Sequence, residues 1–286
     1  MKYHIAAAIT AIIWGVTLIS SKILLNAGMT PIEIMFVRFV LAYVFLWILY
    51  PKKQEINSLY DEIMFLIMGF SGCTMYFICE NTALIYSTAN NVGLICATVP
   101  LATAIMSKIV LKTEKFKKNF YIGSFIAFMG VALVILNGSF VLKLNPLGDF
   151  LALCAVIFWA IFCVFQKKIR GKYHSFVLTR KIFFYGIITM SLTFIYKPFN
   201  YPMQNFCKPE VYGNLIFLGF LASGLCYWLW AIAIKNLGAI VTNNYVYFLP
   251  VITIITSAIF LNEKLTFFTI IGTILIITGL KLTIKN

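Results

Sequence analysis

Glu80 is the ionisable residue best placed for chemistry, because it lies inside a long apolar stretch and is followed by Asn81. Holding a charge in hydrocarbon costs at least about 2.5–3.5 kcal/mol on insertion scales, so such a group is a functional candidate. At helical spacing Glu80 shares a face with Cys73 and Phe77. The carboxylate could bind an amine or take up a proton. The alternatives are a structural partner for a buried basic residue, or a position at the outer water interface.

Two arginines are candidates for holding a carboxylate. Arg38 lies about two turns into its apolar stretch, and Arg180 has the equivalent place later in the chain. A guanidinium can hold a carboxylate through two parallel hydrogen bonds. It can also tie a helix end to neighbouring carbonyls or reach the membrane interface along its alkyl stem. The structural role is favoured for both, most directly for Arg180, which is only a few residues from a basic segment.

Aromatic residues make up 16% of the chain. Many can form belts at a membrane interface, but Trp14 and Trp159 lie near the middle of their apolar stretches, where a belt does not explain them. An aromatic lining suits apolar, aromatic or cationic substrates, whereas plain packing is the alternative. The side chains predicted to form a binding site are Trp14, Tyr76, Phe77, Glu80, Trp159, Tyr227 and Trp230.

Polar residues recur in two stretches that a proline interrupts. Asn91 precedes Pro100 in one, and Asn244 and Tyr247 precede Pro250 in the other. Amides in a membrane need partners, so these three either complete the binding site in a hydrated cavity or form hydrogen bonds between helices. Each proline would kink its helix beyond the polar residues and serve as a hinge.

Residue patterns typical of other chemistries are missing from the sequence. Its two histidines, His4 and His174, are far apart, and no two of its seven cysteines form a Cys-x-x-Cys pair. No metal site, cofactor or disulfide framework is therefore predicted. There is also no Gly-x-Ser-x-Gly element and no Gly-x-x-x-x-Gly-Lys-[Ser/Thr] phosphate loop. These absences argue against an enzyme and against an ATP-driven pump.

The elements that must position these residues are membrane helices. Of the 286 residues, 62% are hydrophobic and only 11% are charged, whereas a soluble domain carries roughly a quarter charged residues. Spanning the hydrocarbon takes about 20 apolar residues. The sequence predicts an all-α polytopic protein, a single integral membrane domain over residues 1–286. The ten predicted transmembrane helices cover roughly 4–25, 30–50, 62–86, 88–111, 118–137, 147–167, 174–196, 211–235, 238–261 and 265–284.

The positive charge fits a membrane protein better than a nucleic-acid-binding one. The formal net charge is +14, but the basic residues stand in short clusters between apolar stretches, and no nucleic-acid-binding motif is present. Lys and Arg concentrate in cytoplasmic loops. The clusters therefore predict that both termini face the cytoplasm, in the cytoplasmic membrane.

The chain also repeats itself, with residues 1–140 matching residues 141–286. Five helices per repeat is an odd number, so the second repeat enters the membrane from the opposite side, which makes an inverted repeat around a pseudo-two-fold axis in the membrane plane. The matched pairs are Trp14/Trp159, Lys22/Lys167, Arg38/Arg180, Tyr43/Tyr185, Gly69/Gly219, Pro100/Pro250, Glu114/Glu263, Gly123/Gly272 and Gly130/Gly279.

This set of motifs resembles the EamA family of the drug/metabolite transporter superfamily, over essentially the whole chain. One departure is that Gly15 follows Trp14, whereas Ala160 follows Trp159. The resemblance implies alternating access around a central cavity. It also implies that the substrate is a small metabolite, such as an amino acid or a related aromatic compound, and that the direction is export.

Several alternatives stay open. A carrier that takes up an organic cation, with Glu80 as its counter-charge, is the second hypothesis, and a channel or a non-transporting membrane protein are others. Partners beyond the lipid bilayer and the small-molecule substrate would be a coupled proton or ion. The glycines at 123, 130, 272 and 279 predict close helix packing. They could lie inside a monomer or at the seam of a homodimer.

Overall fold

All the regular secondary structure in the described residues is helical. The computed structural model describes residues 1–56, 58–87, 89–112, 118–136, 145–169, 171–252, 255–256 and 266–284. In chain order the helical elements are α1 (Lys2–Asn26), α2 (Pro31–Leu49), α3 (Leu59–Gly69), η1 (Phe70–Met75), α4 (Tyr76–Tyr86), α5 (Ala89–Cys96), α6 (Val99–Leu111), α7 (Lys118–Leu136), α8 (Pro146–Lys168), α9 (Ser175–Ser191), η2 (Leu192–Ile195), η3 (Met203–Cys207), α10 (Pro209–Ile216), η4 (Phe217–Leu225), α11 (Cys226–Leu237), α12 (Ala239–Asn243), η5 (Asn244–Phe248) and α14 (Phe267–Ile284).

Eight helical segments are long and apolar enough to cross a membrane, which confirms a multi-pass α-helical membrane protein. They are Lys2–Asn26, Pro31–Leu49, Leu59–Tyr86, Val92–Leu111, Lys118–Leu136, Pro146–Lys168, Ser175–Ile195 and Pro209–Leu237. Ala239–Ile252 and Phe267–Thr283 are shorter apolar helices. They overlap the last two predicted stretches, but residues 257–265 lie outside the described part of the chain. The count of ten membrane helices therefore stays a prediction.

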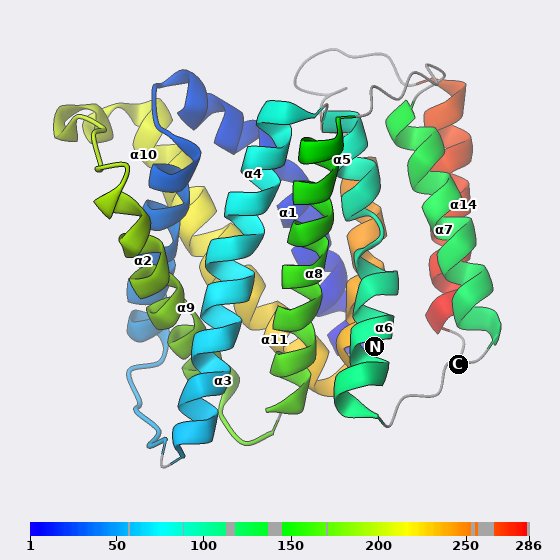
Figure 1. Ribbon diagram of the computed structural model, residues 1–286, viewed down its shortest axis with the longest axis horizontal. Coiled ribbons are helices and arrows are strands. Elements are labelled where there is room, and N and C mark those ends of the chain that lie inside the picture. The colour runs from blue at the N-terminus through cyan, green and yellow to red at the C-terminus, as the bar shows by residue number, and fades with distance from the viewer. Residues whose placement is uncertain are drawn as a thin grey trace.

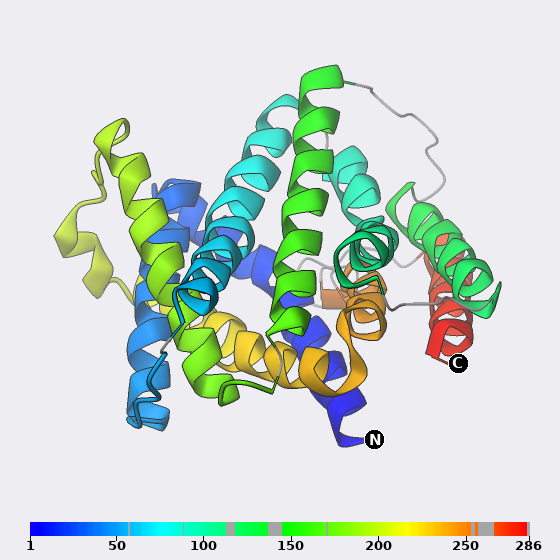
Figure 2. The same ribbon diagram turned by 60° about the horizontal axis from the view of Figure 1, so that its bottom comes forward.

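Consecutive spans run in opposite directions across the bundle, and the two chain ends lie on the same side of it (Figure 1). α2 and α9 stand together at one edge of the bundle, and α7 and α14 stand together at the other. The view in Figure 2 keeps the α7–α14 pair at its edge. Between the edges lie α1, α4, α6, α8 and α11, so the residues predicted for the binding site belong to the middle of the molecule.

Glycines bring α7 and α14 into close contact. A Cβ atom on Gly130 would lie 2.6 Å from the carbonyl oxygen of Gly272, and one on Gly123 would lie 2.6 Å from that of Gly279. Only hydrogen fits at such distances from a backbone oxygen. The four predicted small residues therefore pack against each other within one chain.

The other edge is held by charged residues at the helix ends. Glu33 completes the capping box of α2, accepting from the Thr30 amide at 2.8 Å, and also accepts from the amides of Asn200 and Tyr201 at 2.8 and 3.0 Å. At the opposite end of α2, Arg180 of α9 donates to the carbonyls of Tyr50 and Lys52. An acid at an N-terminus and a base at a C-terminus both complement the helix dipole.

Two long helices change from α to π geometry in their middle. η1 interrupts the helix formed by α3 and α4, and η4 interrupts the one formed by α10 and α11. The two segments contain Phe70 and Phe220, which belong to the matched Gly-Phe pairs at 69–70 and 219–220. A π segment leaves a carbonyl without its regular helical donor and is frequent at functional sites.

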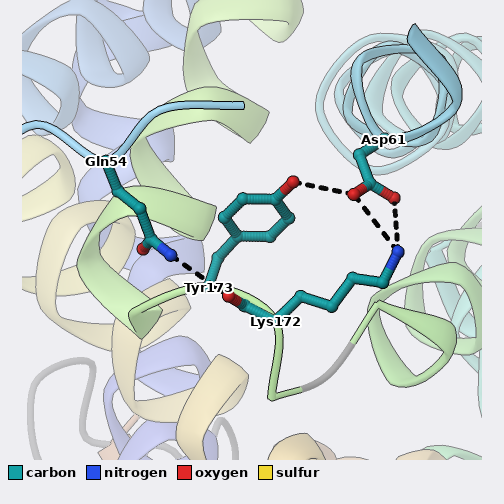
Figure 3. A network of polar contacts seen from close by, with 4 residues as sticks. All are labelled: Gln54, Asp61, Lys172 and Tyr173. Carbon is teal, nitrogen blue, oxygen red and sulfur yellow. Dashed lines mark hydrogen bonds and ion pairs between the residues drawn. The ribbon is translucent and has the colours of Figure 1, made fainter. Parts of the chain in front are cut away.

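A polar network joins the start of α3 to the turn between α8 and α9 (Figure 3). Asp61 accepts from the Tyr173 hydroxyl at 2.7 Å and from the Lys172 ammonium at 3.0 Å. Gln54 donates from its Nε2 to the Lys172 carbonyl and accepts at its Oε1 from the His174 amide. Burial, together with the neighbouring Asp61, raises the pKa of Tyr173 to about 12, so its hydroxyl keeps the proton that it donates.

Candidate functional site

Five of the predicted aromatic residues meet in one cluster in the middle of the bundle, called here the central cluster. The Trp14 ring centroid lies 5.5 Å from that of Trp159, 4.9 Å from Trp230 and 5.8 Å from Tyr227. Tyr76 joins through Trp159, with centroids 5.0 Å apart. These side chains come from α1, α4, α8 and α11. Residues more than 200 positions apart in the sequence therefore form one surface.

Side-chain donors fix the central cluster to backbone oxygens of the π segments. Trp14 Nε1 donates to the carbonyl of Ala222 in η4 at 2.8 Å. The Tyr227 hydroxyl donates to the carbonyl of Gly72 in η1 at 3.3 Å. A Cβ on Gly72 would also collide with the Phe162 ring. The π geometry thus supplies acceptors where two aromatic donors need them.

Glu80 lies at the edge of the central cluster. Its Oε1 accepts from the Tyr76 hydroxyl at 2.7 Å, one turn earlier on α4. Tyr76, Phe77 and Glu80 are half-buried, whereas Trp159, Tyr227 and Trp230 are buried. Trp14 is half-buried as well, so the accessible part of the cluster comprises Trp14 and the α4 face that carries the carboxylate.

Arg38 packs against Phe77 and is only 5% exposed. Its Nε donates to Ser223 Oγ at 2.7 Å, and its guanidinium lies 5.6 Å from the Phe39 ring centroid and 5.7 Å from that of Phe77. Among the described residues no carboxylate lies within 4.0 Å of it. A buried guanidinium without a counter-ion costs free energy that an anionic ligand would recover.

Trp230 keeps an unused donor in the cluster. Its side chain is fully buried, and within the described part of the chain its Nε1 has no hydrogen-bond partner of acceptable geometry. A buried N–H without a partner is costly. A rearrangement of the cluster that opens this side chain would let the N–H pair with an acceptor on a bound molecule.

The structure does not bring every predicted residue into the central cluster. Asn244 and Tyr247 are buried in η5, and Tyr247 packs with α7 and α14 residues instead. Asn91 lies outside the residues whose side chains are described. Pro100 stands in the first turn of α6, and Arg180 lies at the end of α2 with its guanidinium 3.5 Å from the Trp47 ring centroid.

Asn243 was not predicted, yet it contacts the central cluster. Its Oδ1 accepts from Trp159 Nε1 at 2.9 Å and from Cys163 Sγ at 3.7 Å, and its Nδ2 donates to the Ala239 carbonyl. The sequence shows the pair Asn243-Asn244, but it does not show which of the two side chains faces the cluster, because that depends on the rotation of the helix about its axis. The helix phase comes from packing against α8, which the sequence pattern does not reveal.

The fold and the site define a membrane protein in which polar and charged groups are gathered around an aromatic middle. The pattern of the EamA-like transporter family matches residues 1–136 and 146–285. The chain therefore belongs to the EamA-like transporter family, as its motifs indicated, and a membrane transporter is the class of protein to which it belongs.

Similar proteins agree with this assignment. An uncharacterized transporter of Archaeoglobus fulgidus is 30% identical over 99% of this chain and 97% of its own length. The uncharacterized transporter YyaM of Bacillus subtilis is 27% identical over 80% of this chain and 74% of its own. One solved structure, described only as the crystal structure of a protein, superposes with a TM-score of 0.80 at 15% identity, over 98% of this chain and 96% of that one. That structure supports the fold alone.

Proposed function

We propose that this protein is a secondary transporter that exports a small zwitterionic solute of the amino-acid type with an apolar or aromatic side chain. One observation supports the proposal above all others. A buried guanidinium without a carboxylate partner packs against Phe77, and a half-buried carboxylate follows Phe77 three residues later on α4, beside an aromatic cluster. An α-amino acid carries the two complementary charges and an apolar group.

Each part of such a solute has a partner of matching chemistry. The substrate carboxylate would bind Arg38, whose planar guanidinium suits two parallel hydrogen bonds. The ammonium would bind Glu80, held in place by the Tyr76 hydroxyl. The side chain would pack on Trp14 and Trp159, where aromatic faces also favour cationic groups.

Alternating access is the mechanism that fits this arrangement. The alternating directions of the spans and the two matched π segments support the inverted repeat, because both are expected of two related five-helix units in opposite orientation. Such units can exchange conformations and so expose the central cluster to each side of the membrane in turn. Transport would draw on a solute, proton or ion gradient, because the sequence contains no phosphate loop.

An organic cation taken up into the cell is the second candidate. It is favoured by the half-buried Glu80, whose carboxylate has the Tyr76 hydroxyl as its hydrogen-bond partner among the described residues. This candidate leaves Arg38 without a ligand, and for that reason the zwitterion is preferred.

The test uses three related solutes in proteoliposome counterflow: an aromatic amino acid, its decarboxylated amine and its deaminated carboxylic acid. The amino acid should exchange with saturating kinetics, and the other two should compete at least tenfold more weakly. Arg38→Met should remove the preference for the carboxylate, and Glu80→Gln the preference for the ammonium. Glu210→Gln, on exposed α10 surface, is the matched control. If the amine competes as well as the amino acid and Arg38→Met transports normally, the organic-cation candidate replaces the zwitterion.

A further inference from the structure

Three buried oxygen-bearing side chains between η5 and α7 lack hydrogen-bond partners. They are Ser124, Asn244 and Tyr247, and each is 0% exposed. Ser124 Oγ, the Tyr247 hydroxyl and both Asn244 amide atoms have no hydrogen-bond partner in the part of the chain that the structure describes. Leaving one such group unpaired costs about 1–3 kcal/mol, so four in one region call for a ligand.

The three side chains lie on elements that contact each other. Three residues per turn in the 3₁₀ segment η5 place Asn244 and Tyr247 on the same side. η5 contacts α7, the helix that carries Ser124. Tyr247 also packs in one cluster with Ala127 of α7, three residues from Ser124, and with Ala97, at the break between α5 and α6.

Two interrupted helices therefore meet beside these oxygens. Pro100 lacks an amide hydrogen, so the Cys96 carbonyl before Ala97 has no regular helical donor. η5 interrupts the helix that begins with α12. Interrupted helices with free carbonyls are where transporters hold coupling cations.

We propose that Ser124, Asn244 and Tyr247 form a binding site for a sodium ion, separate from the central cluster. All three offer oxygen, the donor preferred by hard cations. All three are also neutral, which favours a monovalent ion, because divalent ions such as Ca²⁺ and Mg²⁺ recruit carboxylates. The Asn244 amide oxygen and the Ser124 and Tyr247 oxygens would ligate the ion together with free backbone carbonyls.

Adjacent residues would couple this site to the central cluster. Asn243 accepts from Trp159 of the cluster, and Asn244, the next residue, belongs to the sodium site. A cation that fixes the junction of α12 and η5 therefore also fixes the acceptor of the Trp159 indole. This coupling rests on the proposed transport function, whereas sodium binding does not.

Sodium binding can be measured on the purified protein without any substrate. Thermal unfolding is followed while NaCl replaces choline chloride at constant total salt, with a parallel series in KCl. A ligand of the native state raises the unfolding midpoint as its concentration rises. The midpoint should rise and saturate with Na⁺ and stay constant with K⁺.

Substitutions locate the site. Ser124→Ala and Asn244→Leu should each weaken the apparent sodium affinity at least tenfold, and Asn244→Asp should tighten it by a similar factor through its added charge. Asn236→Ala is the control, because that exposed amide bonds only within its own helix and should leave the affinity unchanged. Asn244→Asp guards against variants that simply fail to fold, because it gains binding.

Three outcomes would overturn the inference: the same shift with every salt, an unchanged sodium affinity in both weakening variants, or a folded Asn244→Asp with unchanged affinity. A sodium gradient should also accelerate solute flux in the wild type but not in Asn244→Leu. Sodium binding without any solute flux would count against the proposed function and leave the site standing.

Discussion

At the scale of single residues, the site depends on polar groups whose partners lie on distant elements. Trp14, Tyr227 and Trp159 each donate to an acceptor on another helix. A hydrogen bond in a water-poor interior is costly to leave unmade, so each pair fixes a ring more firmly than packing alone. The orientation of the central cluster therefore depends on η1, η4 and α12 as much as on the aromatic residues.

Asn243 is the residue through which this dependence can be tested. Asn243→Ala leaves Trp159 Nε1 buried without its acceptor, so stability should fall by about 1–3 kcal/mol and solute affinity with it. Denaturant unfolding and counterflow measure the two effects.

The double variant Asn243→Ala/Trp159→Phe distinguishes the hydrogen bond from general packing. Its loss of stability should be smaller than the sum of the two single losses, since Phe has no donor to leave unpaired. Asn214→Ala, which removes an exposed amide that bonds within its own helix, is the control. Strict additivity would show that the Asn243–Trp159 bond contributes nothing.

At the scale of elements, the bundle combines two fixed pairs with interrupted helices between them. α7 and α14 pack through glycines, and α2 is held at both ends by charged groups and pairs with α9. The segments that supply acceptors to the central cluster or residues to the proposed sodium site include η1, η4 and η5, all departures from α geometry. Such segments are common at hinges and functional sites, so we expect movement there and not in the edge pairs.

Gly130→Ala tests the close contact of α7 and α14. A Cβ there would lie 2.6 Å from the Gly272 carbonyl oxygen and 2.8 Å from the Ile276 amide nitrogen, both backbone atoms. The helices must separate, so we expect a loss of about 1–3 kcal/mol of stability, measured by denaturant unfolding.

Gly213→Ala provides the contrast on α10. A Cβ at Gly213 meets nothing within 4 Å, and Ala in a helix interior is favoured over Gly by about 0.5–1 kcal/mol. This variant should be as stable as the wild type or slightly more so. An equally stable Gly130→Ala would mean that the glycine contact is not what holds the edge.

At the scale of the whole molecule, the distribution of basic residues predicts how the bundle is oriented in the membrane. The basic clusters predict that the end with both chain termini faces the cytoplasm. The polar network of Asp61, Lys172 and Tyr173 lies between the start of α3 and the turn before α9, at that same end (Figures 1 and 3). In this conformation the network would therefore link the cytoplasmic ends of helices from residues 1–140 and from residues 141–286.

The native Cys207 reports this orientation. It is exposed and lies two residues before the start of α10, which begins at the end of the bundle away from the chain termini (Figure 1). A membrane-impermeant maleimide should therefore label Cys207 in intact cells, and Cys207→Ser should abolish the signal.

Lys53→Cys in the Cys207→Ser background tests the side of the membrane that is predicted to be cytoplasmic. Lys53 is exposed in the segment before α3, and a cysteine there should react only after the membrane is permeabilised. The reverse pattern of labelling would invert the predicted topology.

The amino-acid sequence by itself determined the membrane class, the family and most of the helices, because these depend on composition and on local period. The capping box at Thr30–Glu33, Pro100 in the first turn of α6 and the glycines of α7 and α14 are signals carried by neighbouring residues. The tertiary structure decided which side chains meet. It brought Trp14, Trp159, Tyr227 and Trp230 together, turned Asn243 to the cluster and Asn244 away from it, and placed Arg38 against Ser223. Helix phase and the pairing of distant helices result from packing over the whole bundle, and no local pattern specifies them.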